Sequence, residues 1–144
     1  MKNWSRWFKK WRALPLKSRW LLFRVAVCIV LVKIGLKVLP FKRFRVVYDF
    51  FVSNANDQTY TADYVGKLVW SVQVISSVLP FEVLCLPQAL AVKYFLRFER
   101  GYGLKIGVSN HGQLFSAHAW VEKDGKIVIG EIPTINYVPL WAWS

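Results

Sequence analysis

Three residues have the types that nucleophilic acyl transfer requires: Cys85, His118 and Glu131. A thiolate attacks a carbonyl carbon, an imidazole moves the protons, and a carboxylate orients the imidazole and stabilises its protonated form. The pattern therefore predicts an enzyme that cleaves or transfers an acyl group through Cys85, provided that the fold brings the three side chains together.

Cys85 opens an apolar segment, residues 85–96, with Pro87 near its start. Proline suits the first turn of a helix, where its missing N–H costs nothing. We therefore expect Cys85 at or next to the helix N-cap, where the helix dipole favours a thiolate and free N–H groups can hold an oxyanion. Taken alone, Cys-Leu-Pro more often marks a small hydrophobic residue at a helix start, so the prediction depends on the C-terminal third.

That third predicts a small antiparallel sheet. Residues 103–108 alternate like a strand, and residues 114–121 and 126–129 form a hairpin around Asp124-Gly125. One helix followed by three antiparallel strands predicts an α+β fold. A thiol at a helix start, a histidine on a following strand and an acid on the next strand give the order found in papain-like sites.

The hairpin register decides which residue faces His118. If Asp124 and Gly125 are the two turn residues, Val121 faces Val128 and His118 faces Glu131, whose carboxylate then accepts a hydrogen bond from the imidazole. A three-residue turn puts residue 130 opposite His118 instead. Asp124 is the other candidate acid, although its place in the turn favours a structural role.

The remaining histidine and cysteine are weaker candidates. His111 lies among turn residues, and Cys28 lies within an apolar run. No disulfide framework or zinc-ligand spacing follows from two cysteines 57 residues apart. A free thiol is compatible with a reducing cytoplasm, which we expect to be the compartment, and we expect no metal or organic cofactor.

Basic charge is concentrated at the front of the chain. Residues 1–45 hold 13 Lys and Arg and no acid, whereas the other 99 residues have a net charge of −1. We therefore divide the chain into a helical basic segment, residues 1–47, and a catalytic domain, residues 48–144. Pro15 and Pro40 should break the basic segment into helices of about 12 and 20 residues.

The first of these helices is amphipathic, because Trp4, Trp7, Phe8 and Trp11 recur at steps of three and four among basic residues. This stripe could lie on an anionic membrane, bind an acidic partner, or pack against the next helix of the chain. Residues 20–41 do not favour a membrane span, because three basic residues interrupt them. Nucleic-acid binding is disfavoured, because no groove-reading or stacking motif is present.

Between these regions the sequence predicts a loop and a further helix. Residues 48–60 hold a cluster of turn formers and read as a loop. Thr61 can cap a helix that has Asp63 in its first turn and ends before Pro80.

The runs CLPQALAVKYFLRFERGYGLKIGV and AHAWVEKDGKIVIGE resemble the peptidase half of the lasso-peptide biosynthesis B protein family, within the transglutaminase-like superfamily. The resemblance covers about residues 66–135, and the basic front with LPFKRF is similar to the family's N-terminal region. It implies a transglutaminase-like or papain-like core with cysteine at Cys85 and histidine at His118. The family's third residue is commonly an Asp about twelve residues after the histidine. Here residue 130 is Gly and Glu131 follows.

The function implied by this resemblance is leader-peptide cleavage in the maturation of a ribosomally made lasso-peptide precursor (RiPP maturation). The partners implied are the precursor, a separate leader-binding recognition-element protein and an ATP-dependent lasso cyclase. Two alternatives stay open. One is acyl transfer to an amine by the same site, and the other is a non-catalytic adaptor that binds a membrane surface through residues 1–45.

Overall fold

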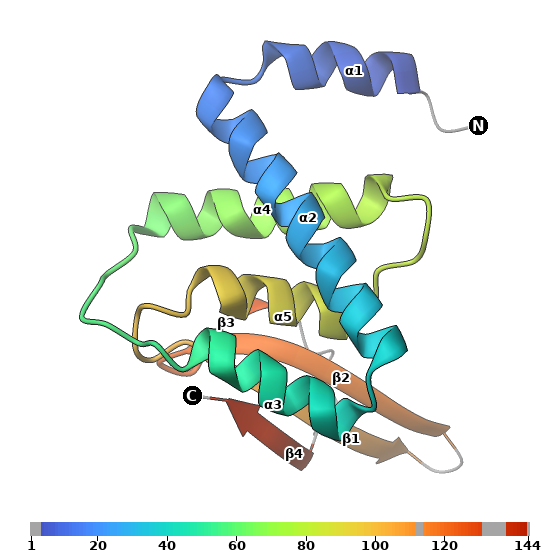
Figure 1. The fold of residues 1–144 in the computed structure, drawn as a ribbon, viewed down its shortest axis with the longest axis vertical. Coiled ribbons are helices and arrows are strands. Elements are labelled where there is room, and N and C mark those ends of the chain that lie inside the picture. Colours follow the sequence, from blue (N-terminus) through green and yellow to red (C-terminus); the bar gives the residue numbers. More distant parts are fainter. Residues whose placement is uncertain (1–3, 112–113, 131–137, 144) are drawn as a thin grey trace.

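The computed structural model describes residues 4–111, 114–130 and 138–143, in which helices precede an antiparallel sheet (Figure 1). This arrangement confirms the predicted α+β fold class. The elements are α1 (Trp4–Ala13), α2 (Leu16–Val38), α3 (Phe41–Val52), α4 (Ala62–Val78), α5 (Cys85–Phe95), β1 (Gly103–His111), β2 (Leu114–Lys123), β3 (Lys126–Ile129) and β4 (Val138–Trp143).

The basic front forms three helices. Pro15 and Pro40 have extended backbone and precede α2 and α3, as expected of residues that cannot continue a helix. The prediction that a loop begins at Tyr48 is wrong, because α3 continues to Val52. Its buried residues, Phe44, Tyr48 and Val52, recur every fourth position, and this packing stabilises the helix beyond the polar residues that suggested a loop.

The front helices and the catalytic region share one hydrophobic core. Leu22, Val25, Ile29 and Val32 form the buried stripe of α2, which packs against α4 and α5. In α1, Trp11 packs against the same core, and the guanidinium of Arg19 lies 5.6 Å from the centre of its ring. Of the alternatives for the α1 stripe, packing against the next helix is thus observed for Trp11.

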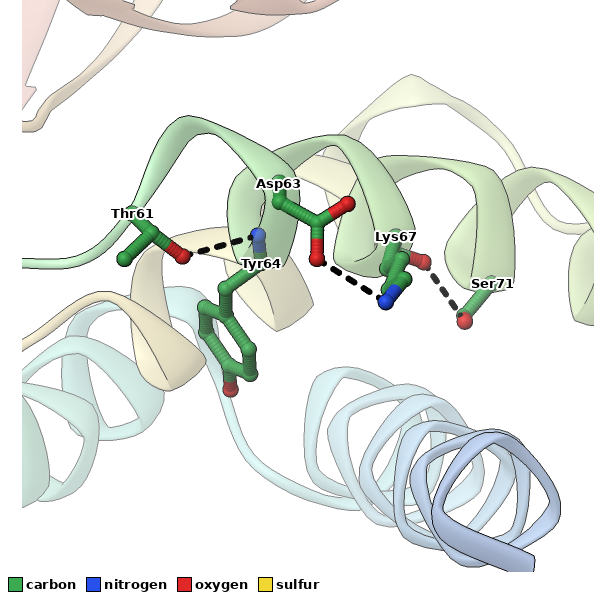
Figure 2. Close-up of polar contacts among 5 residues, drawn as sticks. All are labelled: Thr61, Asp63, Tyr64, Lys67 and Ser71. Atoms are coloured by element: carbon green, nitrogen blue, oxygen red, sulfur yellow. Dashed lines mark hydrogen bonds and ion pairs between the residues drawn. The ribbon is translucent and has the colours of Figure 1, made fainter. Parts of the chain in front are cut away.

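Helix α4 begins and ends where the sequence predicts. The Thr61 hydroxyl accepts a hydrogen bond from the Tyr64 backbone N–H at 3.2 Å, and Asp63 pairs with Lys67 at 2.8 Å one turn later (Figure 2). Further along, the Ser71 hydroxyl donates to the Lys67 carbonyl at 2.7 Å, a bond internal to the helix (Figure 2).

Helix α5 lies at the centre of the molecule, between the sheet and the crossed helices α2 and α4 (Figure 1). Four consecutive residues, Ala89, Leu90, Ala91 and Val92, are at most 1% exposed, so the helix is covered on every side. The buried hydroxyl of Tyr48 in α3 donates to the Leu90 carbonyl at 2.6 Å. Burial of each large side chain contributes about 1.5–3 kcal/mol, which fixes the position of the helix relative to the sheet.

The sheet has four strands in the described part of the chain, in the order β3-β2-β1-β4. The three strands expected from the sequence are confirmed, and β4 was not predicted. The strand has the sequence VPLWAW, with Pro at the second position. It pairs with β1 at the edge of the sheet, where the missing N–H of proline is tolerated.

The hairpin turn has the predicted two residues, but its register differs. Asp124 and Gly125 have φ values of +50° and +74°, as in the hairpin turns that match strand twist. Lys123 pairs with Lys126, and then a bulge shifts the register so that Val121 pairs with Ile129. The predicted pairing of Val121 with Val128 is therefore wrong, since an extra residue in β3 is not visible in the alternation of apolar residues.

Glu99 joins the loop before α4 to the end of β2. Its carboxylate accepts a hydrogen bond from the Tyr60 backbone N–H at 2.5 Å and forms an ion pair with Lys123. Burial opposes ionisation of Glu99, but the hydrogen bonds from Lys123 and Tyr60 outweigh it and lower the pKa of the carboxyl. The charged form of Glu99 therefore stabilises the folded state.

We predict that Glu99→Gln lowers the free energy of unfolding at neutral pH by about 1–3 kcal/mol, because it leaves two donors without their charged acceptor. Since the folded pKa is below the unfolded one, this stabilisation is present above the unfolded pKa and is lost as pH falls through the folded pKa. Urea unfolding of the unmodified protein and of Glu99→Gln should show that the difference between their free energies of unfolding becomes smaller as the pH is lowered into the acidic range. Glu82→Gln, at an exposed position, is the control, and a difference independent of pH would contradict the assignment.

Candidate active site

Cys85 is the first residue of α5, as predicted. The preceding Leu84 is extended and supplies no side-chain cap, so the N–H groups of the first turn are not capped by it. The Gln88 side chain folds back and donates to the Val83 carbonyl at 3.0 Å, which holds the chain that enters the helix. Cys85 is partly buried and lies at the positive end of the dipole of this 11-residue helix.

Cys28 is a free cysteine in a very different environment. It lies on α2 between helices, and burial raises the pKa of its thiol to about 12, with Arg97 and Arg24 opposing the rise only in part. At neutral pH its thiol is protonated, and a protonated thiol is a poor nucleophile. Of the two cysteines, Cys85 is therefore the one placed for chemistry.

The orientation of the His118 ring follows from its hydrogen bond to the backbone of residue 130. Nε2 lies 3.2 Å from the Gly130 carbonyl oxygen. A carbonyl only accepts hydrogen bonds, so Nε2 carries the proton and Nδ1 of the neutral ring carries the basic lone pair. The bond therefore makes Nδ1 the atom that can take a proton from a nucleophile.

Gly130 can hold this position only because it has no side chain. Its φ is +86°, and a Cβ atom built on it would lie 2.5 Å from the Ala119 carbonyl oxygen and 3.0 Å from Trp120 Cα. The close approach brings the Gly130 carbonyl beside β2, within reach of His118. Glycine at residue 130 is thus required by this backbone geometry.

Trp120 holds the other side of the His118 ring. The two rings are nearly parallel, at 18° with centroids 6.4 Å apart. The indole N–H donates to Glu122 at 3.0 Å, and Glu122 pairs with Lys105 on β1. Hydrogen bonds from Lys105 and from Trp120 lower the pKa of Glu122, so its carboxylate keeps the indole in place.

The structure brings the elements that carry Cys85 and His118 into contact, since α5 packs against β2. Cys85 packs against the apolar core, and the contacts of His118 include those with Gly130 and Trp120. The regular β1–β2 pairing places Ala119 on the core face and His118 on the alternate face with Trp120. Pairing of the Cys85 thiol with the His118 imidazole therefore stays a prediction.

Of the two candidate acids, Glu131 and Asp124, the structure describes only Asp124. Glu131 lies outside the described residues, so its predicted role stays a prediction. Asp124 lies in the exposed turn, six residues beyond His118. At about 3.4 Å per residue of extended strand this is about 20 Å, too far for it to orient the imidazole.

The sequence predicted residue 130 only as the cross-strand neighbour of His118 after a three-residue turn. It did not predict that the Gly130 carbonyl is a hydrogen-bond partner of the His118 ring. A glycine directly after a short strand is a weak signal of such a contact. His111 ends β1.

Comparison with known proteins gives one family. The sequence matches the family described as Transglutaminase-like superfamily over residues 28–142, a stretch that includes Cys85 and His118. No curated protein and no solved structure matches the chain significantly.

We predict that Gly130→Ala removes the Nε2–H tautomer of His118, because the new Cβ displaces the carbonyl, and that it destabilises the fold by about 1–3 kcal/mol. The ¹⁵N chemical shifts of the imidazole report the tautomer directly. Gly125→Ala is the matched control: residue 125 also has positive φ, but nothing lies within 4 Å of its added Cβ. An unchanged His118 spectrum in Gly130→Ala would show that the carbonyl does not orient the ring.

Proposed function

The chain belongs to the transglutaminase-like superfamily, which includes cysteine peptidases and acyl transferases, and from this premise we propose that it is a cysteine peptidase. The observation that carries the proposal is the position of Cys85 at the start of a buried helix that packs against the strand bearing His118. In this position a thiolate faces the positive end of the helix dipole and the N–H groups of the first turn.

The proposed reaction has two steps. Nδ1 of His118 takes the thiol proton, Cys85 Sγ attacks the scissile carbonyl, and the proton passes to the leaving amine as the C–N bond breaks. The resulting thioester is hydrolysed by a water whose proton His118 accepts, which regenerates the thiol and releases a carboxylate. The N–H groups of the first turn of α5 are the donors available to the oxyanion. Each step uses only protein groups and water.

The substrate proposed is the leader region of a ribosomally made lasso-peptide precursor. The support is the resemblance of residues 85–108 and 117–131 to the peptidase of lasso-peptide biosynthesis. In this proposal a separate recognition-element protein binds the leader and an ATP-dependent cyclase closes the product. Glu131 is proposed as the third member of the site, completing with its carboxylate the orientation that the Gly130 carbonyl begins.

The central test of the nucleophile uses the two cysteines as a matched pair. We predict that Cys85→Ala abolishes cleavage of a precursor peptide, whereas Cys28→Ala retains it, because only Cys85 lies at a helix start and the Cys28 thiol is protonated at neutral pH. Cleavage is followed by mass spectrometry, with and without a candidate recognition protein. Cleavage by folded Cys85→Ala would rule out this nucleophile.

Acyl transfer by the same site is the second candidate, because the superfamily also includes acyl transferases. The two reactions differ in the second step, where either water or an amine attacks the thioester. We predict that the masses of the cleavage products add up to the mass of the precursor plus one water, and that no product carries an added amine. Products in which an added primary amine replaces the water would instead assign a transferase.

A further inference from the structure

Helix α2 has two apolar faces, of which the core uses one. The stripe opposite its buried residues is exposed, with Trp20 at 62% and Leu31 at 63%. Its members recur at steps of three and four and so lie on one line along the helix: Leu16, Trp20, Phe23, Val27, Leu31, Ile34 and Val38. A contiguous exposed apolar surface of this extent marks a site of protein or membrane interaction, so this face is expected to have an occupant.

Helix α3 extends this surface. Phe50, 75% exposed, and Val46 project from it, and a groove of about 400 Å³ separates the two helices. The groove is lined mainly by apolar side chains of α2 and α3, among them Val27 and Phe51, and neither Cys85 nor His118 lines it. Both helices lie on the near side of the molecule in Figure 1, in front of α4 and the sheet. We call the exposed apolar residues of α2 and α3 the α2–α3 face.

Exposed cations border the α2–α3 face. At 100° per residue, Lys17 and Arg24 lie on one side of the α2 stripe and Lys37 on the other, and α3 adds Lys42 and Arg43. The segment that contains them, residues 1–45, has no acid. Aromatic and aliphatic side chains bordered by Lys and Arg are the composition of helices that lie in the headgroup region of a bilayer.

We propose that the α2–α3 face docks the protein on the surface of an anionic lipid bilayer, with α2 and α3 lying in the interface. No described helix is both long and apolar enough to cross a membrane. The exposed side chains project outward and can enter the acyl boundary, and each cation that reaches the anionic surface strengthens binding about fivefold. A second copy is the poorer occupant, because a symmetric contact would bring the cations of both copies together.

The test uses the full chain and flotation with two kinds of vesicle, phosphatidylcholine alone and phosphatidylcholine with phosphatidylglycerol. We expect binding only to the anionic vesicles, and weaker binding as salt is raised. Lys17→Glu with Lys37→Glu should weaken it by about tenfold or more. The control is Arg100→Glu with Lys126→Glu, which makes the same change in net charge at exposed positions outside the front segment. After correction for the effect of net charge, which the two double variants share, the control should bind within about twofold of the unmodified protein.

The apolar contribution is tested separately. Leu31→Gln with Phe50→Gln should weaken vesicle binding by about tenfold or more, since it removes two large apolar groups from the acyl boundary. Trp70→Gln with Ile127→Gln, also exposed, should leave binding unchanged. Thermal unfolding confirms that each variant is folded.

Three results would overturn the proposal. The first is no binding to either vesicle, and the second is equal binding by the α2–α3 variants and their controls. The third is a dimer in sedimentation that Leu31→Gln with Phe50→Gln dissociates, which would assign the α2–α3 face to a second copy. Retained precursor cleavage by the α2–α3 variants in vesicle-free solution would separate docking from catalysis.

Discussion

The burial of α5 is the constraint on which the rest of the structure depends. Its residues 89–92 are enclosed by α2, α3 and α4 on one side and by the sheet on the other, so the helix cannot shift without opening the core. Losing the packing of one large side chain of this kind costs about 2–5 kcal/mol, a large part of the stability of a domain this size. Since Cys85 is the first residue of this helix, the same packing fixes the position of the thiol.

The position of His118 depends on a different feature, the irregular end of β3. The bulge between Val121 and Glu122 in the β2–β3 pairing and the positive φ of Gly130 bring a backbone carbonyl to Nε2. A carbonyl fixes the tautomer but carries no full charge, so it stabilises an imidazolium less than a carboxylate does. The carboxylate of Glu131, the proposed third residue, would stabilise the charged imidazole more strongly than this carbonyl does.

How far the sequence predicted this structure depended on whether the signals were local. Thr61 marked the start of α4, and Asp124-Gly125 marked the hairpin turn, because caps and turns are set by neighbouring residues. The helical state of Tyr48–Val52 and the bulge in β3 were missed, because both follow from packing against distant residues. The residue types of Cys85 and His118 were readable, whereas the Gly130 contact with His118 depends on backbone geometry that no sequence pattern expresses.

If the Cys85 thiol and the His118 imidazole act as one unit, the imidazole should raise the reactivity of the thiol. In a Cys28→Ala background Cys85 is the sole cysteine, and its alkylation by iodoacetamide can be timed at mildly acidic pH, where an isolated thiol is protonated. We expect His118→Ala to slow this alkylation by about tenfold or more and His111→Ala to leave it unchanged. Equal rates in all three proteins would contradict it.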